Sequence, residues 1–199
     1  MVCRSRKRWH LRGYFHSHVA DGESCRVALL AQLRKALFAF NIFPMKILFV
    51  FTGQTFDKPV GELMSVYEGR ISRYVSHGIV ELKTKNEKGE SIERIKEKEQ
   101  KEQLKQTGER DVLILLDENG KQFSSVEFAA QLQKLLSASS RRIIFMTGGA
   151  YGFGSEISKR ADLKISFSRF TFTHQVIRVL LLEQVYRAFT IINNEKYHH

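Results

Sequence analysis

The feature that most constrains this fold is the regular alternation of short apolar runs with helical patterns from Met45 onward. The run 45–53, MKILFVFTG, consists of strand-forming residues closed by Gly53, which is typical of a buried parallel strand. Further strands are predicted at 78–85, at Val112–Leu116, within 141–154 and within 161–174. Helical patterns separate these strands, so the sequence predicts a three-layer α/β domain around a mostly parallel sheet.

The predicted helices differ in how much apolar surface they offer. The helix 59–75 places five apolar side chains on one side: Leu63, Val66, Tyr67, Ile71 and Tyr74. The helix 91–106 is highly charged and has only Ile92, Ile95 and Leu104 as an apolar side. Because a charge run of this kind is usually a solvated face, it is not expected to form a site.

The stretch 111–136 is the clearest strand–turn–helix unit of the chain. After the strand Val112–Leu116, a turn is predicted at Asn119 and Gly120, followed by a helix that ends at Leu136. Ser124 or Ser125 is the expected N-cap, and Ser124 with Glu127 three residues later resembles a capping box.

The first 44 residues differ from the rest in charge. They hold eight Lys/Arg and two Asp/Glu, or +6 of the net charge of +11 that the 199 residues carry. We expect residues 1–44 to be a basic extension, non-native or disordered, ahead of a domain at 45–199. An organellar transit peptide is an alternative, as is a mis-assigned start with Met45 as the natural first residue.

The composition also bears on partners and location. A net charge of +11 points to a polyanionic partner such as nucleic acid, although a merely basic surface explains it equally well. Both cysteines, Cys3 and Cys25, precede Met45, which suits a reducing, cytoplasmic location. With His16 and His18 they fit no usual ligand spacing, so no metal is expected. No apolar run reaches about 18 residues, so no membrane span is predicted.

Three loops that follow predicted strands are candidate binding segments, because ligands of open α/β sheets bind beyond the carboxyl ends of the strands. They are 115–121, 147–154 and 166–174. The glycines of the second loop allow positive φ and a close approach to a ligand. Their spacing matches neither GxGxxG nor a P-loop, which disfavours a dinucleotide or nucleotide site. Tight turns without a ligand remain the alternative.

The C-terminal helix, within 170–189, carries charges among its leucines and valines. At about 100° per residue, His174 and Arg178 share one side, and Glu183 and Arg187 share another, where they could pair. The alternative is a core helix with one snorkelling edge. The sequence shows no Ser/His/Asp triad, no carboxylate pair and no metal cluster.

Several quoted stretches together resemble the RlmH (YbeA-like) family of SPOUT methyltransferases. They are MKILFVFTG, LLDENGKQFSSVEFA, TGGAYGFG, ISFSRFTFTHQVIRVLLLEQVYRAF and the terminal NNEKYHH. The resemblance covers 45–199 and none of 1–44. It implies an α/β knot with a C-terminal trefoil, a homodimer and bound S-adenosylmethionine. It further implies methylation of N3 of a pseudouridine in 23S-type large-subunit rRNA on the assembled ribosome.

The resemblance also implies roles for individual residues. The cofactor residues implied by position are Leu116, Asp117, Gly148, Gly149, Ser168, Arg169, Phe170, Thr171, Phe172 and Thr173. The catalytic candidates are Arg187, Tyr197 and His198, as the base that removes the acceptor's proton or the cation that stabilises its anion. His174 is expected to support the cofactor loop. The phosphate-contact candidates are Arg141, Arg142, Lys159, Arg160 and Arg169.

Two departures from the family pattern are visible. The chain has FTFTHQ where relatives carry MTFPHQ or MTFSHQ, so Phe170 replaces Met and Thr173 replaces Pro or Ser. Cofactor binding is expected to survive these changes. EKEQ at Glu97–Gln100 replaces EKEG, which puts a local turn in question.

Two rival functions stay open from the sequence. One is a methyltransferase of the same fold with another RNA target, since fold does not determine substrate. The other is a non-catalytic, basic RNA-binding or ribosome-assembly protein.

Overall fold

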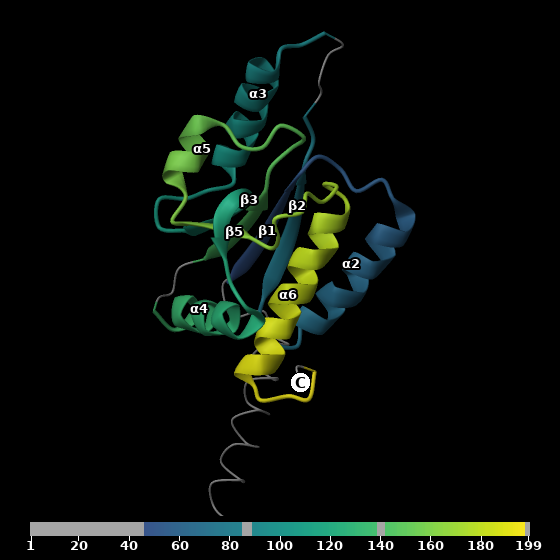
Figure 1. Cartoon of the computed structure of the whole chain (residues 1–199), viewed down its shortest axis with the longest axis vertical. Coiled ribbons are helices and arrows are strands. Elements are labelled where there is room, and N and C mark those ends of the chain that lie inside the picture. Colours follow the sequence, from purple (N-terminus) through teal and green to yellow (C-terminus); the bar gives the residue numbers. More distant parts are fainter. Residues whose placement is uncertain (1–45, 85–88, 139–141, 198–199) are drawn as a thin grey trace, which may run out of the picture.

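The computed structural model describes residues 46–84, 89–138 and 142–197. The predicted extension 1–44 lies outside the described residues, as do Arg141 and His198. Within the described part the chain forms a five-stranded sheet with helices on both faces (Figure 1).

The sheet is parallel at every pairing, with the strand order β2-β1-β4-β3-β5. The strands are β1 (Ile47–Thr52), β2 (His77–Leu82), β3 (Val112–Gln122), β4 (Ile143–Thr147) and β5 (Leu163–Ser166). β1 and β4 are buried along their whole length, because helices cover both of their faces. The predicted parallel α/β sheet is confirmed, whereas the trefoil knot stays a prediction.

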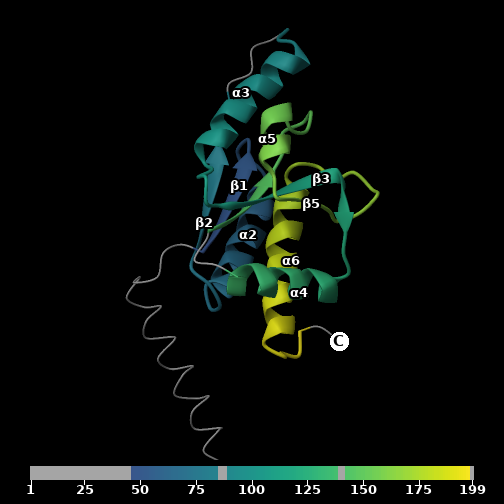
Figure 2. The same ribbon diagram turned by 90° about the vertical axis from the view of Figure 1, so that its left-hand side faces the viewer.

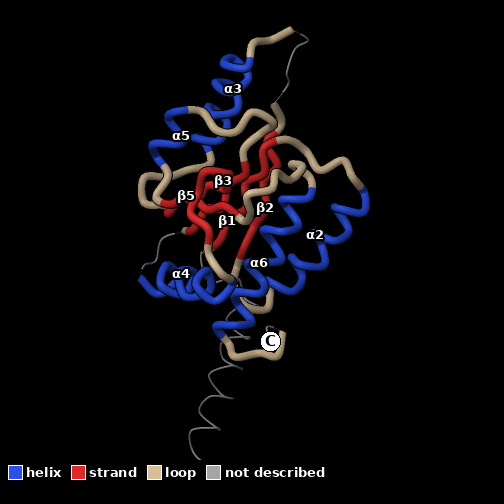
Figure 3. The backbone as a smooth tube through the Cα atoms, in the orientation of Figure 1, coloured by secondary structure: helices blue, strands red, loops and turns tan. Residues whose placement is uncertain are grey.

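The helices are divided between the two faces of the sheet (Figure 3). The first face packs α2 (Lys58–Ile71), α4 (Ser125–Ala138) and α6 (Val176–Ile192) on alternate β1 side chains that include Phe49. On the other face, Leu48 and Val50 join Ile157 of α5 (Ser155–Arg160) and Leu104 of α3 (Ile92–Lys105). Figure 2 shows α3 and α5 toward the carboxyl ends of the strands, and the C-terminus at the far end.

Two sequence predictions about helix faces were right only in part. Of the stripe predicted for 59–75, Ile71 is buried and Tyr67 and Tyr74 pack against the core, but Leu63 and Val66 are 45% and 47% exposed and Met64, which was not predicted, is buried. The helix is turned so that the stripe of Met64 and Ile71, seven residues apart, meets the sheet. On α3 the charge run is not uniformly solvated, because Glu99 and Gln103 are buried beside Ile95.

The end of β3 also differs from the prediction. The expected turn at Asn119 and Gly120 lies within the strand, which continues to Gln122. Leu116 and Lys121 both pair with Ile165, so the residues between them bulge out of the ladder. The predicted capping box is confirmed by hydrogen bonds from Glu127 N to Ser124 Oγ (3.2 Å) and from Ser124 N to the Glu127 carboxylate (2.7 Å).

Gly120 is required where the bulge crosses β5. A Cβ at this position would lie 2.5–2.8 Å from the backbone N, Cα and C of Ile165, which cannot rotate away. We expect Gly120→Ala to lower the free energy of unfolding by about 1–3 kcal/mol in urea titrations. Gly69→Ala, on an exposed turn of α2 with open space around it, is the matched control and should be neutral or stabilising. Equal stability of the Gly120 variant and the native protein would contradict this account of the bulge.

Candidate cofactor and catalytic site

Strand register brings the predicted cofactor loops to one edge of the sheet. Thr147, the last residue of β4, pairs with Phe51 of β1 on one side and Leu116 of β3 on the other. Leu116 in turn pairs with Ile165 of β5. The bulge of β3 after Leu116, the loop after β4 and the loop after β5 therefore start side by side. They are about 30 and 20 residues apart in the sequence.

The glycine segment after β4 forms a tight turn against α3. Gly152 donates its N–H to Gly149 O (3.1 Å) and has φ +76°, the one glycine of this loop with positive φ. A Cβ on Gly149 would lie 2.3 Å from an oxygen of Glu99, and one on Gly154 would lie 2.2 Å from Gln100 Oε1. A side chain at 149 or 154 would therefore displace the end of the Glu99 or Gln100 side chain, which packs directly on the loop.

The loop after β5 is held by its own hydroxyl groups and leaves two phenyl rings exposed. Ser168 Oγ accepts the N–H of Phe170 (2.9 Å), while Thr173 Oγ1 accepts the N–H of Val176 (3.3 Å). Thr173 therefore caps the first turn of α6 with its hydroxyl group. The side chains of Phe170 and Phe172 are 83% and 41% exposed, which leaves apolar surface available to a ligand.

Arg178 is the most deeply buried charged residue of the described chain, with no exposed surface. Its guanidinium donates to the carbonyl oxygens of Thr52 and Gly53 (both 3.0 Å) and of His174 (2.9 Å). It also donates to Thr55 Oγ1 (2.6 Å) and lies 3.4 Å from a carboxylate oxygen of Glu81. Burial lowers the pKa of Arg178, and the charge of Glu81 opposes that shift. Arg178 therefore cross-links the end of β1 to the start of α6.

The neighbouring Gln175 holds the same loop from a second point. Its side-chain amide donates to Gln54 O (3.0 Å) and accepts the N–H of Phe56 (3.3 Å). The Phe56 ring, 76% exposed, meets the His174 ring edge to face at 5.9 Å. Gln175, Thr55 and Glu81 were not predicted from the sequence. Nothing in the residues around them indicates that they hold this loop or bind Arg178.

A buried polar cluster lies beneath the glycine segment. Gln103 donates its amide to Thr52 Oγ1 (2.9 Å), which donates to Thr147 O (2.8 Å). Glu99 lies one turn earlier on α3, and burial raises the pKa of its carboxyl group. Three oxygens of the cluster have no hydrogen-bond partner among the described residues: Glu99 Oε2, Gln103 Oε1 and Thr147 Oγ1.

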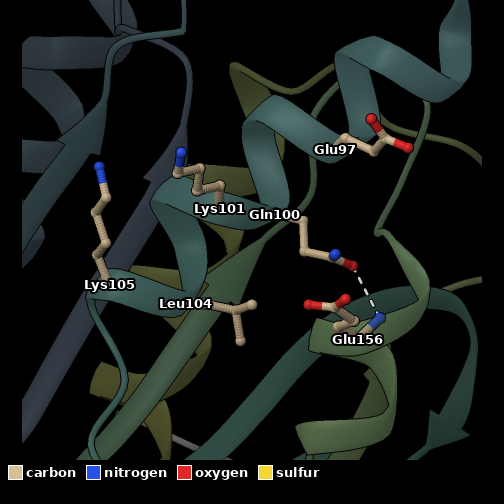
Figure 4. Close-up of a pocket in the computed structure, with 6 residues that line it drawn as sticks. All are labelled: Glu97, Gln100, Lys101, Leu104, Lys105 and Glu156. Carbon is tan, nitrogen blue, oxygen red and sulfur yellow. Dashed lines mark hydrogen bonds between the residues drawn. The ribbon is translucent and has the colours of Figure 1, made fainter.

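The outer side of α3 carries a separate groove (Figure 4). Its lining residues are Glu97, Gln100, Lys101, Leu104, Lys105 and Glu156. Gln100 Oε1 accepts the N–H of Glu156 (2.8 Å) and so caps the start of α5. Glu97–Gln100, where the EKEQ change put a local turn in question, lie inside α3, in agreement with the predicted helix 91–106.

The catalytic candidates that the structure describes form a cluster at the end of α6. The predicted pair is confirmed, with Arg187 donating to Glu183 at 2.6 and 3.0 Å. Tyr197 donates to the same carboxylate (3.2 Å), and its ring lies 4.8 Å from the guanidinium of Arg187. Burial, with hydrogen bonds to Tyr67 and Glu183, raises the pKa of Tyr197 to about 12. The hydrogen bond to Glu183 raises the pKa of Arg187, so Arg187 stays cationic and Tyr197 stays protonated at neutral pH.

The candidate phosphate contacts separate into paired and exposed residues. Arg142 binds Asp111 at 2.6 Å, and Arg160 binds Asp162 at 3.2 Å and two backbone carbonyls of the 108–111 turn. Burial alone would raise the pKa of Asp111, but hydrogen bonds from Arg142 and Gly108 lower it. Lys159 and Arg169 are exposed, so these two stay the better candidates.

Comparison with known proteins gives the family. Residues 45–198 match a family model described as "Predicted SPOUT methyltransferase". The chain belongs to the SPOUT methyltransferase family.

Two relatives of this SPOUT methyltransferase are both named "Ribosomal RNA large subunit methyltransferase H". The one from Christiangramia forsetii is 43% identical over 158 residues, covering 78% of this chain and 99% of its own. The one from Geobacter sulfurreducens is 44% identical over 155 residues, covering 78% and 100%. A solved "probable methylase family protein" from Haemophilus influenzae is more distant, with 12% identity, coverage of 77% and 68%, and a TM-score of 0.47.

In this SPOUT methyltransferase the predicted cofactor loops and the catalytic candidates lie at opposite ends of α6 (Figure 1). Thr173 caps the first turn, whereas Arg187 lies eleven residues beyond Val176, roughly 16 Å along the helix axis. Tyr197 lies farther still, near the C-terminus. One chain therefore does not bring its predicted cofactor and catalytic residues together.

The described residues contain no group of three or more His, Cys, Asp or Glu side chains that could hold a metal ion. Over the same part of the chain, no helix has the length and apolar character needed to cross a membrane.

Removing the Arg178 cross-link should destabilise the SPOUT methyltransferase strongly. Arg178→Met leaves the carbonyls of Thr52, Gly53 and His174 without their donor, so we expect a loss of roughly 3 kcal/mol in the free energy of unfolding. Urea titration measures this loss. Arg73→Met, on the exposed side of the α2 end, is the matched control and should change stability by less than about 0.5 kcal/mol. A similar small change in both variants would show that the cross-link is dispensable.

Proposed function

We propose that the protein is an S-adenosylmethionine-dependent methyltransferase of large-subunit ribosomal RNA, acting on N3 of a pseudouridine. The observation that carries this proposal is the family match over 45–198 together with the meeting of its three loops at one sheet edge. The proposed setting is the assembled ribosome in the cytoplasm, because the chain has no separate RNA-binding domain within 45–199. The predicted trefoil knot belongs to the same proposal.

The residues at this edge fit S-adenosylmethionine. The exposed Phe170 and Phe172 rings supply apolar surface for the nucleoside, and the Glu99 carboxylate of α3 packs against Gly149. Buried oxygens without partners lie beneath the glycine turn, where a cationic ligand would be accepted. The residues proposed to hold the cofactor are Leu116, Asp117, Gly148, Gly149 and 168–173.

The cofactor, when bound, supplies an activated methyl group on its sulfonium, so the protein has chiefly to position and shield the reactants. The acceptor nitrogen is an imide, which must lose its proton before it can take the methyl group. Arg187 stays cationic and would stabilise the resulting anion, while Tyr197 stays protonated and would donate a hydrogen bond. Neither group is a base at neutral pH. His198, outside the described residues, stays the candidate for that step.

The separation of the two ends of α6 favours a homodimer. In an opposed arrangement, Arg187 and Tyr197 of one copy would reach the cofactor loops of the other. Exposed apolar side chains available for burial lie on α2, on the loop before α6 and at the start of α6: Leu63, Val66, Phe170, Phe172 and Val176. The site is then shared between two chains and is incomplete in either one alone.

The decisive experiment incubates the protein with ribosomes and methyl-labelled S-adenosylmethionine and maps the modified nucleotide. Label on N3 of a large-subunit pseudouridine is the expected result. Label on another nucleotide would support the rival RNA target. Absence of cofactor binding in calorimetry would support the non-catalytic RNA-binding function.

A mixing experiment tests the shared site. Gly149→Ala should lose cofactor binding, because its Cβ meets the Glu99 carboxylate, whereas Arg187→Ala should keep binding and lose methyl transfer. Co-expression of the two inactive variants should restore roughly a quarter of native activity, because half of the dimers are mixed and each mixed dimer has one intact site. No recovery, with mixed dimers verified by affinity tags, would show that each site lies within one chain.

A further inference from the structure

Glu99 is a buried carboxyl group without a cationic partner. It is 5% exposed, its Oε2 has no hydrogen-bond partner, and no Lys, Arg or His of the described chain forms an ion pair with it. By contrast, Glu102 of the same helix pairs with Lys105 at 2.6 Å and lies in contact with solvent. Burying an unpaired carboxylate is unfavourable, so its place in the interior calls for a counter-charge.

Two other buried oxygens on the elements around Glu99 also lack a hydrogen-bond partner among the described residues. Gln103 directs its amide to Thr52, which leaves its fully buried Oε1 unpaired. Thr147, 3% exposed, likewise has an unpaired Oγ1. Three buried oxygens from α3 and β4 thus lack partners. The carboxylate and amide oxygens can only accept and the hydroxyl can accept or donate, so a positively charged ligand group would satisfy them.

Glu99 also touches the cofactor segment directly. Its carboxylate oxygens lie 2.3 and 2.5 Å from the position that a Cβ of Gly149 would occupy. The negative charge is therefore next to the backbone that is proposed to hold the methyl donor. The outer groove of Figure 4 lies on another side of α3 and includes none of Glu99, Gln103 and Thr147.

We propose that Glu99 is the counter-charge for the cationic methyl donor, with Gln103 and Thr147 as additional acceptors beneath the glycine turn. The inference rests on the proposed function, since it takes S-adenosylmethionine as the ligand. Two groups of that ligand are cationic, the sulfonium and the α-ammonium, and both have the chemistry that the buried oxygens require. The sulfonium loses its charge when the methyl leaves with the electron pair staying on sulfur, whereas the ammonium keeps its charge.

The charged groups around α3 leave Glu99 free to respond to a ligand. β1 has no titratable side chain, β2 carries His77 and Glu81, and α5 carries Glu156, Lys159 and Arg160. On α3 itself, Lys96 and Glu102 lie three residues before and after Glu99, and Lys98 is adjacent to it in the sequence. Burial is the one cause that raises the pKa of Glu99. The free protein therefore binds a proton at Glu99 up to a higher pH, and an arriving cation releases that proton.

Calorimetry on the full chain tests the proposal with Glu99→Gln and the matched control Glu97→Gln, an exposed glutamate of the same helix. Glu99→Gln should weaken S-adenosylmethionine binding about tenfold or more, and Glu97→Gln less than twofold. Proton release on binding, measured in buffers of different ionisation enthalpy, should be lost in Glu99→Gln alone. Unchanged affinity and unchanged proton release in Glu99→Gln would overturn the proposal.

S-adenosylhomocysteine, which lacks the sulfonium charge, identifies the group that Glu99 faces. If its affinity is the same for Glu99→Gln and the native protein, the partner is the sulfonium. If its affinity falls as much as that of the donor, the partner is the ammonium. Failure of the native protein to bind S-adenosylmethionine at all would refute the proposed function rather than this assignment.

Urea unfolding of the ligand-free protein distinguishes a ligand-binding role of Glu99 from a structural role. With its pKa raised by folding, Glu99 makes the ligand-free protein less stable as pH rises through that pKa. Glu99→Gln should therefore unfold at an equal or higher urea concentration than the native protein at pH 8, with the difference vanishing at acid pH. A less stable variant that also binds the donor poorly would overturn the proposal, because the carboxylate would then support the fold.

Discussion

The guanidinium of Arg178 is the interaction on which the arrangement of the cofactor edge depends. It joins the carbonyls that end β1 to the first turn of α6, and no part of it reaches solvent. Because charged groups are costly to bury, each of its donors is matched to an acceptor: three carbonyls, a hydroxyl and a carboxylate. The loop that contains Phe56 and the loop that ends at Thr173 are consequently fixed to the same point.

The charge run of α3 illustrates how one helix serves two environments. Its outer residues, among them Glu97, form the groove of Figure 4, whereas Glu99 and Gln103 face the strand ends. At position 149 the Glu99 carboxylate occupies the space that a side chain would fill. Glycine at 149 thus suits the contact with α3 whether or not a ligand is bound. The same contact brings a carboxylate and two further unpaired oxygens next to the cofactor segment.

The distance between the two ends of α6 shapes the functional proposal. A helix of 17 residues separates the capped loop from the Arg187–Glu183 cluster, and its rigidity prevents the two from meeting within one chain. A second copy resolves the separation without any change of fold. Cofactor binding and acceptor activation would then be tasks of different chains in each site.

The sequence by itself determined the strand and helix alternation, the capping box at Ser124 and the Glu183–Arg187 pair, since each depends on residues close together in the chain. The alternation in turn favours a parallel sheet, although its strands pair over long separations. Family resemblance supplied the cofactor loops. Only the tertiary structure decided that Arg178 is buried rather than snorkelling, that Leu63 is exposed and that Glu99 is enclosed. These outcomes depend on partners such as Glu81 and Gly149, about 50 to 100 residues away, and helical periodicity cannot specify such contacts.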